Sequence, residues 1–213
     1  LDIQFDKRAI RLDAARRRVG FADGTDVGYD ALLSTIPLPE LIAMAVDAPA
    51  DVRAAAAKLR SLRQYCVNLV VDRVGLSAAN WFYIYDSDVA VSRVSFPFSL
   101  SGEEVDRTAI QAEIFLPGDA RPDEDTLRDQ AVADMGRILK FEAADVLAAE
   151  IRCYPHSYVV SDLNRAPAVA HVRDWLREQG IETAGLFGSW HYLWSDRAYA
   201  SGQAAARTLE ELP

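Results

Sequence analysis

The chain has few cysteines, few histidines and no metal-binding pattern, and each shortage excludes a class of protein. Only two cysteines occur among 213 residues, Cys66 and Cys153, and they stand far apart inside apolar stretches. This pattern is typical of buried thiols in a reducing compartment, so it favours the cytoplasm over a disulfide-bonded secreted domain. The three histidines share no metal-ligand spacing and no CxxC pair is present, which predicts no metal site.

Positive charge and long apolar runs are also scarce. The formal net charge is −9, which opposes binding to phosphate backbones or to anionic lipid surfaces. No apolar run approaches the ~20 residues that a membrane-spanning helix needs. We therefore expect no nucleic acid partner and no membrane span. The expected partner is a small molecule.

The standard phosphate-binding and hydrolase motifs are absent as well. Neither GxGxxG nor GxxxxGK[ST] occurs, and no GxSxG marks a nucleophilic serine. A nucleotide cofactor would need its phosphate cradle from elsewhere. The chain begins at Leu1 inside a strand-like pattern without an initiator methionine, so we expect it to be a piece of a longer polypeptide.

The pattern of apolar residues predicts sheets at the start and in the middle of the chain. Residues 1–5, 9–12 and 19–21 alternate and predict an antiparallel meander, and residues 31–36 predict a buried strand. Further strands are expected over 65–71, 81–85, 89–96, 109–116 and 150–160. Helices are expected over 39–46, 50–59, 125–141 and 168–179. A strand over 183–187, a loop and a helix over 196–212 end the chain.

The segment from Gly185 to Gly202 is the most informative stretch. Glycines at the end of a strand let the backbone approach a ligand closely. A helix that starts at Ser195 or Asp196 presents free N–H groups, and amides near Arg197 and Ala198 could stabilise the negative charge of a reduced flavin. The alternative is that Ser195 and Asp196 only cap a structural helix.

This segment, read as Gly-Leu-Phe-Gly-Ser-Trp-His-Tyr followed by Ser195-Asp196 and Gly202, resembles the terminal flavin-contacting motif of the flavin amine oxidase superfamily. The likeness is strongest to protoporphyrinogen oxidase-like proteins and UDP-galactopyranose mutases. Three further blocks agree in their order along the chain: residues 29–37, residues 81–85 leading to 93–97, and Tyr154-Pro155. The resemblance spans nearly the whole chain.

The resemblance implies an α+β or α/β protein in which an antiparallel substrate-domain sheet with helices is flanked by pieces of a Rossmann-like domain that binds FAD or NAD(P). It places flavin-domain pieces at 1–37 and 182–213 and the substrate-binding domain at 38–181. The implied cofactor is FAD, with the GxGxxG segment upstream of this chain. The residues that it places near the cofactor are Ala9, Gly185, Gly188, Asp196, Arg197 and Ala198.

The resemblance also implies substrate contacts. Arg93 and Tyr192 match positions that contact the substrate diphosphate in the mutase branch, a task that suits a guanidinium and a phenol. Tyr83, in the alternating aromatic run 81–85, would line the cavity over the flavin. The alternatives are that Arg93 is an ordinary surface residue of a strand and that the aromatic run is one packed sheet face.

The implied activity is that of an FAD-dependent oxidoreductase that transfers hydride from an organic substrate to flavin. No residue is identified as a general base, since such reactions rely heavily on the cofactor. One alternative is a UDP-galactopyranose mutase-like isomerase, and Leu186 speaks against it because many relatives of that branch carry arginine there. A second alternative is a non-catalytic flavoprotein-like binding module.

Overall fold

The computed structural model describes residues 2–102 and 106–210, and contacts between residues divide the chain into two compact units. Unit 1 is formed by residues 1–60 and 159–213, and unit 2 by residues 61–158. The chain therefore leaves unit 1 once and returns to it. The flavin and substrate domains were predicted to meet at 37/38 and 181/182. These domains are defined by what they bind, whereas the two units are defined by contacts, so the predicted limits stay a prediction.

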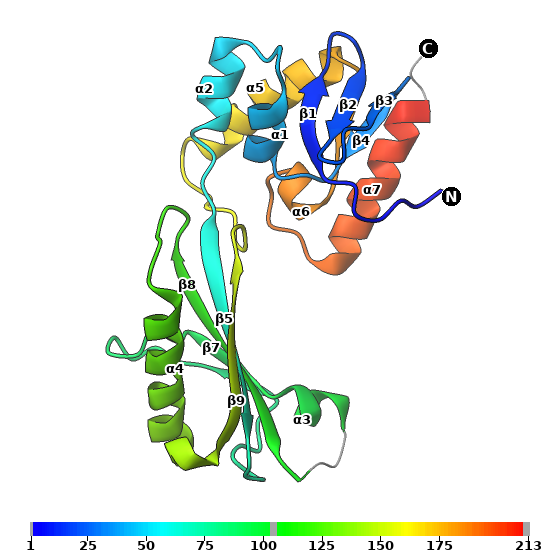
Figure 1. Cartoon of the computed structure of the whole chain (residues 1–213). Coiled ribbons are helices and arrows are strands. Elements are labelled where there is room, and N and C mark those ends of the chain that lie inside the picture. The colour runs from blue at the N-terminus through cyan, green and yellow to red at the C-terminus, as the bar shows by residue number, and fades with distance from the viewer. Residues whose placement is uncertain (1, 103–105, 211–213) are drawn as a thin grey trace. The chain divides into compact units, whose positions relative to one another are not determined.

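Unit 1 combines a three-stranded meander, a parallel pair of strands and five helices among the described residues (Figure 1). Its elements are β1 (Ala9–Asp13), β2 (Arg18–Phe21), β3 (Asp26–Gly28), β4 (Leu32–Ser34), α1 (Leu38–Met44), α2 (Ala50–Ala56), α5 (Arg165–Glu178), β10 (Ile181–Thr183), α6 (Gly185–Gly188) and α7 (Ser195–Glu210).

The meander is confirmed, but its predicted first strand is wrong for residues 2–5, which form no strand. Strands β1, β2 and β3 pair antiparallel in that order. The buried carboxylate of Asp13, at the end of β1, accepts hydrogen bonds from Arg11 and Arg16. These bonds lower the pKa of Asp13, with the Arg16 side chain as the largest cause and burial opposing the shift. Residues 2–5 were predicted as a strand because apolar and polar residues alternate there, but alternation does not show whether a neighbouring strand is available for pairing.

The core of unit 1 lies between α1, α2 and α5. Leu38, Ile42, Val172 and Leu176 are buried there, together with Trp190 from the segment after α6. Helix α5 carries an apolar stripe at helical spacing, as the sequence predicted, and it contacts both α2 and β10. This packing holds the parallel pair of strands against the rest of the unit.

Unit 2 is a five-stranded antiparallel sheet in the order β6-β7-β8-β5-β9. Its elements are β5 (Leu62–Val71), β6 (Trp81–Tyr83), β7 (Arg93–Ser95), α3 (Pro97–Ser101), β8 (Thr108–Pro117), α4 (Glu124–Leu139), the 3-10 turn η1 (Ala143–Asp145) and β9 (Val146–Tyr154).

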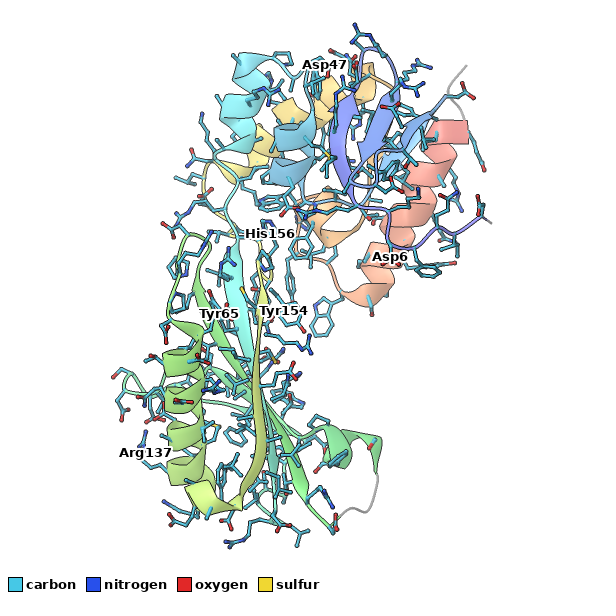
Figure 2. The ribbon with its side chains drawn as sticks, in the orientation of Figure 1. Asp6, Asp47, Tyr65, Arg137, Tyr154 and His156 are labelled. Atoms are coloured by element: carbon cyan, nitrogen blue, oxygen red, sulfur yellow. The ribbon has the colours of Figure 1, made fainter. Side chains whose placement is uncertain are left out.

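Helix α4 covers one face of this sheet. Alternate residues of the two long central strands point toward it and are buried with Ala131 and Met135 of the helix: Tyr65, Val67, Leu69 and Val71 from β5, and Ile110, Ala112 and Ile114 from β8. Figure 2 shows Tyr65 on the side of α4 and Tyr154 on the opposite side of the sheet. Because successive side chains of a strand point to opposite faces, the residues between these core positions lie on the face away from α4.

Helix α4 ends at Lys140, which adopts a left-handed conformation with φ 63° and ψ 48°. Its N–H donates to the carbonyl of Gly136, an arrangement in which glycine is the usual residue. We expect Lys140→Gly to raise the free energy of unfolding by about 1 kcal/mol, because the Cβ of an L-residue is strained there. Chemical denaturation measures the change.

The matched control is Lys58→Gly, since Lys58 is also exposed but does not have positive φ. Glycine there only increases the entropy of the unfolded chain, so we expect a loss of stability. A stabilisation at Lys58, or a loss at Lys140, would contradict the role of the left-handed cap.

Candidate functional site

One candidate site lies at the carboxyl ends of the two parallel strands of unit 1. Strand β10 pairs with β4 in a register that places Thr183 beside Ser34. Parallel strands end at one edge, and in open α/β sheets ligands bind outside that edge. The N–H of Ala184 donates to the carbonyl of Ser34 over 3.0 Å, so the backbone segments that leave both strands start side by side.

The strand predicted over residues 183–187 is wrong beyond Thr183. Strand β10 ends at Thr183, and residues 185–188 form the short helix α6. Gly185 adopts φ +77°, a left-handed conformation that turns the chain out of the extended strand. The side chain of Ser201 in α7 accepts a hydrogen bond from the Gly185 N–H over 2.9 Å, which ties this turn to the last helix.

Gly188 ends α6 in tight contact with the segment after β4. A Cβ at this position would lie 2.9 Å from the carbonyl oxygen of Ser34 and 3.3 Å from the Cα of Thr35. Both atoms belong to the backbone, so no rotamer change can make room. At Gly185, in contrast, a Cβ would meet nothing within 4 Å. The first glycine therefore lies beside open space, and the second lets α6 pack directly against the backbone at the end of β4.

Helix α7 presents the next predicted residues. Asp196, Arg197 and Ala198 lie in its first turn, as the sequence analysis expected for a helix that starts near Ser195. The N–H of Ala198 donates to the carbonyl of Trp194 over 2.8 Å. The amides of Ser195, Asp196 and Arg197 precede this first helical bond, so none of them has a carbonyl partner within the helix.

A hollow of about 670 Å³ lies against the start of β1 and the segment after β4. Ala9, predicted to lie near the adenine, lines it together with Ile36 and Pro37. Lys7, which forms an ion pair with Asp23, lies at its wall with Arg8 and Glu40. Met44 adds an apolar surface. Apolar walls with a few charged groups are typical of small-molecule sites.

A second, separate candidate site is the face of the unit 2 sheet that points away from α4, here called the open face. Strand pairing aligns its side chains in two rows across all five strands. The first row is Trp81, Ser95, Gln111, Asn68 and Glu150. The second row is Tyr83, Arg93, Glu113, Cys66 and Arg152. Polar groups occupy the centre of this face and aromatic rings its edge.

Arg93 and Glu113 form the central ion pair of the open face. The Nη2 atom of Arg93 donates to both carboxylate oxygens of Glu113, at 2.8 and 2.7 Å. The side chain of Arg93 is 33% exposed and that of Glu113 only 4%. The hydrogen bond to Glu113 is the largest cause that raises the pKa of Arg93, against a smaller opposing effect of burial. Arg93 therefore stays charged at any physiological pH.

Sequence reasoning missed Glu113. The signal was present, because Glu113 is the single charged residue in a strand of otherwise apolar or neutral residues, Thr108–Pro117. Its neighbour in the row, Cys66, is a buried free thiol. Burial, and secondly the charge of Glu113, raise the pKa of this thiol to about 11. Cys66 is therefore a neutral thiol near pH 7 and a weak nucleophile.

The predicted substrate residues fall in both units. Tyr83 and Arg93 are direct cross-strand partners on the open face, and Tyr83 has 48% of its surface exposed. Tyr192 belongs to unit 1, in the segment between α6 and α7, and is 46% exposed. The structure thus brings two of the three predicted substrate residues together within one unit. Their roles stay predictions.

No protein-family model and no curated protein matches the chain. Among solved structures, reduced UDP-galactopyranose mutase matches with a TM-score of 0.83 and 18% identity over 97% of this chain. A protoporphyrinogen oxidase-like protein from Exiguobacterium sp. 255-15 gives a TM-score of 0.74 at 18% identity, also over 97%. The chain has the fold of these proteins.

A third solved structure, a fatty acid isomerase from P. acnes that produces CLA, matches over 94% of this chain with a TM-score of 0.68 and 15% identity. The chain spans 46–47% of the length of each of the three. The predicted fold class, a mixed α and β protein with an antiparallel sheet and helices, is confirmed. Among the described residues no helix combines the length and the apolar character that crossing a membrane requires.

Proposed function

We propose that this chain is part of an FAD-dependent oxidoreductase of the amine oxidase and protoporphyrinogen oxidase type, acting on a small organic substrate. The observation that carries the proposal is the left-handed Gly185 after β10, which lies beside open space and whose N–H donates to Ser201 of α7. The first amides of α7 have no carbonyl partner within that helix. The likeness of fold to three solved structures, two of them named as a mutase and an oxidase-like protein, supports this superfamily.

The residues present fit part of an FAD molecule. Gly185 lets the cofactor approach the backbone closely, because no side chain intervenes. The buried hydroxyl of Thr183 has no hydrogen-bond partner among the described residues, so a polar ligand atom at the strand end would satisfy it. The hollow beside Ala9 offers apolar walls for an adenine, and Arg8 at its wall would face the cofactor phosphates.

In this function the protein positions reactants and stabilises charge. When bound, FAD would supply the hydride-accepting chemistry. The amides of Asp196 and Arg197, at the positive end of the α7 dipole, would stabilise negative charge at the isoalloxazine edge. Tyr83 and Arg93 would contact the substrate on the open face. The resemblance implies a substrate role for Tyr192 of unit 1 as well. The mutase and binding-module alternatives gain no better support from the comparisons.

The test is the visible absorption spectrum of the full-length gene product after purification. We expect the bands of an oxidised flavin, which bleach when dithionite is added. A folded but colourless protein that also fails to bind added FAD would overturn the proposed function. The mutase alternative would replace the proposed function under a different result. The protein would then show a flavin spectrum, no amine, porphyrinogen or polyene substrate of a panel would reduce it, and the reduced protein would turn over UDP-galactopyranose.

A further inference from the structure

The open face of unit 2 is balanced in charge. It carries two arginines, Arg93 and Arg152, and each forms an ion pair with a glutamate of the same face. The Arg93 pair differs from the other because its carboxylate is almost fully buried. Glu150 and Arg152 are both more than half exposed, so water screens that pair. Glu113 therefore places a weakly screened negative charge directly beside Arg93.

This arrangement disfavours a multiply charged anion at Arg93. A diphosphate that approached the guanidinium would also approach the Glu113 carboxylate, which lies within 2.8 Å of the same nitrogen. The attraction to the cation is then largely offset by repulsion from the anion behind it. A neutral hydrogen-bond acceptor meets no such repulsion, because it carries no charge. Arg93 can also donate to it, because a guanidinium carries five N–H donors and both bonds to Glu113 come from the Nη2 atom.

The aromatic edge of the face suits a flat ring. Trp81 and Tyr83 pack edge to face with ring centroids 5.3 Å apart, and Tyr85 continues the row at 6.2 Å from Tyr83. All three rings are exposed, with Trp81 at 52% of its surface. An exposed row of rings beside a hydrogen-bonding group provides stacking and one directional contact.

We propose that Glu113 determines the charge of the substrate, so that the open face accepts a flat, uncharged ring bearing a hydrogen-bond acceptor and rejects a diphosphate. This proposal rests on the proposed function only in taking the open face as the substrate surface. It also explains why an arginine at a position that resembles a diphosphate contact is held by a buried carboxylate. Glu113 acts as a specificity-determining residue through Arg93, and it forms no bond in the reaction.

The experiment compares two probes by calorimetry on the full-length gene product: 2-naphthol, a flat neutral ring, and UDP, a diphosphate. We expect the wild type to bind 2-naphthol and to show no binding of UDP at millimolar concentration. Glu113→Gln keeps the size of the side chain and an acceptor for Arg93 but removes the charge. It is expected to strengthen UDP binding about tenfold or more, because the cation is then uncompensated.

The matched control is Glu150→Gln, which removes a carboxylate from the same face but from the screened pair, and it should leave both affinities unchanged. Arg93→Ala added to Glu113→Gln should abolish the gained UDP binding, and Tyr83→Ala should weaken 2-naphthol. Thermal melts establish that each variant is folded. UDP binding by the wild type as tight as by Glu113→Gln, or no binding of 2-naphthol, would overturn the proposal.

Failure of this proposal is distinguishable from failure of the proposed function. The flavin spectrum tests whether the protein holds FAD, whereas the probe preference tests the charge selectivity of the open face. A colourless protein that shows the expected exchange of probes supports the role of Glu113 and overturns the flavin function. A flavin-containing protein that binds UDP at Arg93 equally well with and without Glu113 supports the flavin function and overturns the role of Glu113.

Discussion

Gly188→Ala is expected to lower the free energy of unfolding of the chain by about 1–3 kcal/mol and to weaken flavin retention. The added Cβ would lie 2.9 Å from the carbonyl oxygen of Ser34, well inside van der Waals contact, and the Thr35 backbone closes the other side. Overpacking of this kind costs energy because main-chain atoms must move. The movement would separate α6 from the end of β4, where the proposed cofactor surface is formed.

The same substitution elsewhere in the motif gives a matched control. Gly202 lies inside α7, and a Cβ there would meet nothing within 4 Å. Gly202→Ala should therefore stabilise the protein by about 0.5–1 kcal/mol, because alanine loses less backbone entropy in a helix. Denaturation curves measure both changes, and absorbance after gel filtration measures retained flavin. Equal effects at the two glycines would show that the contact with Ser34 is not what requires glycine at 188.

Arg93→Ala is expected to destabilise the protein by about 3–5 kcal/mol, because it leaves the buried carboxylate of Glu113 without its partner. Thermal melts and denaturation curves of the variant and the wild type measure this loss.

A second variant distinguishes the cost of leaving the Glu113 charge unpaired from the cost of losing the packing of the Arg93 side chain. Adding Glu113→Gln to Arg93→Ala removes the buried charge, so the double variant should be more stable than Arg93→Ala alone. Arg152→Ala is the control on the same face, and its exposed pair with Glu150 should contribute less than about 1 kcal/mol. If Arg93→Ala and Arg152→Ala cost the same, the central pair has no special role in stability.

Much of the fold was predictable from local patterns. Helix α4 appears where the apolar stripe of residues 125–141 predicts it, and β5 and β8 appear where alternation predicts strands. These patterns are readable because period 2 and period 3.6 follow directly from backbone geometry. The errors arise because an apolar pattern does not specify strand pairing or backbone dihedral angles. Residues 2–5 alternate but form no strand, and Gly185 turns the chain after Thr183.

The sequence by itself determined most of the strands and helices, the fold class and the glycine-rich segment that resembles a flavin-contacting motif. Only the tertiary structure decided that Arg93 and Glu113, twenty residues apart, share a row, that Gly188 touches Ser34, and that the open face is neutral. The physical reason is that strand register and close packing join residues distant in the chain. Periodicity records which face a residue occupies, and it carries no record of the neighbour across from it.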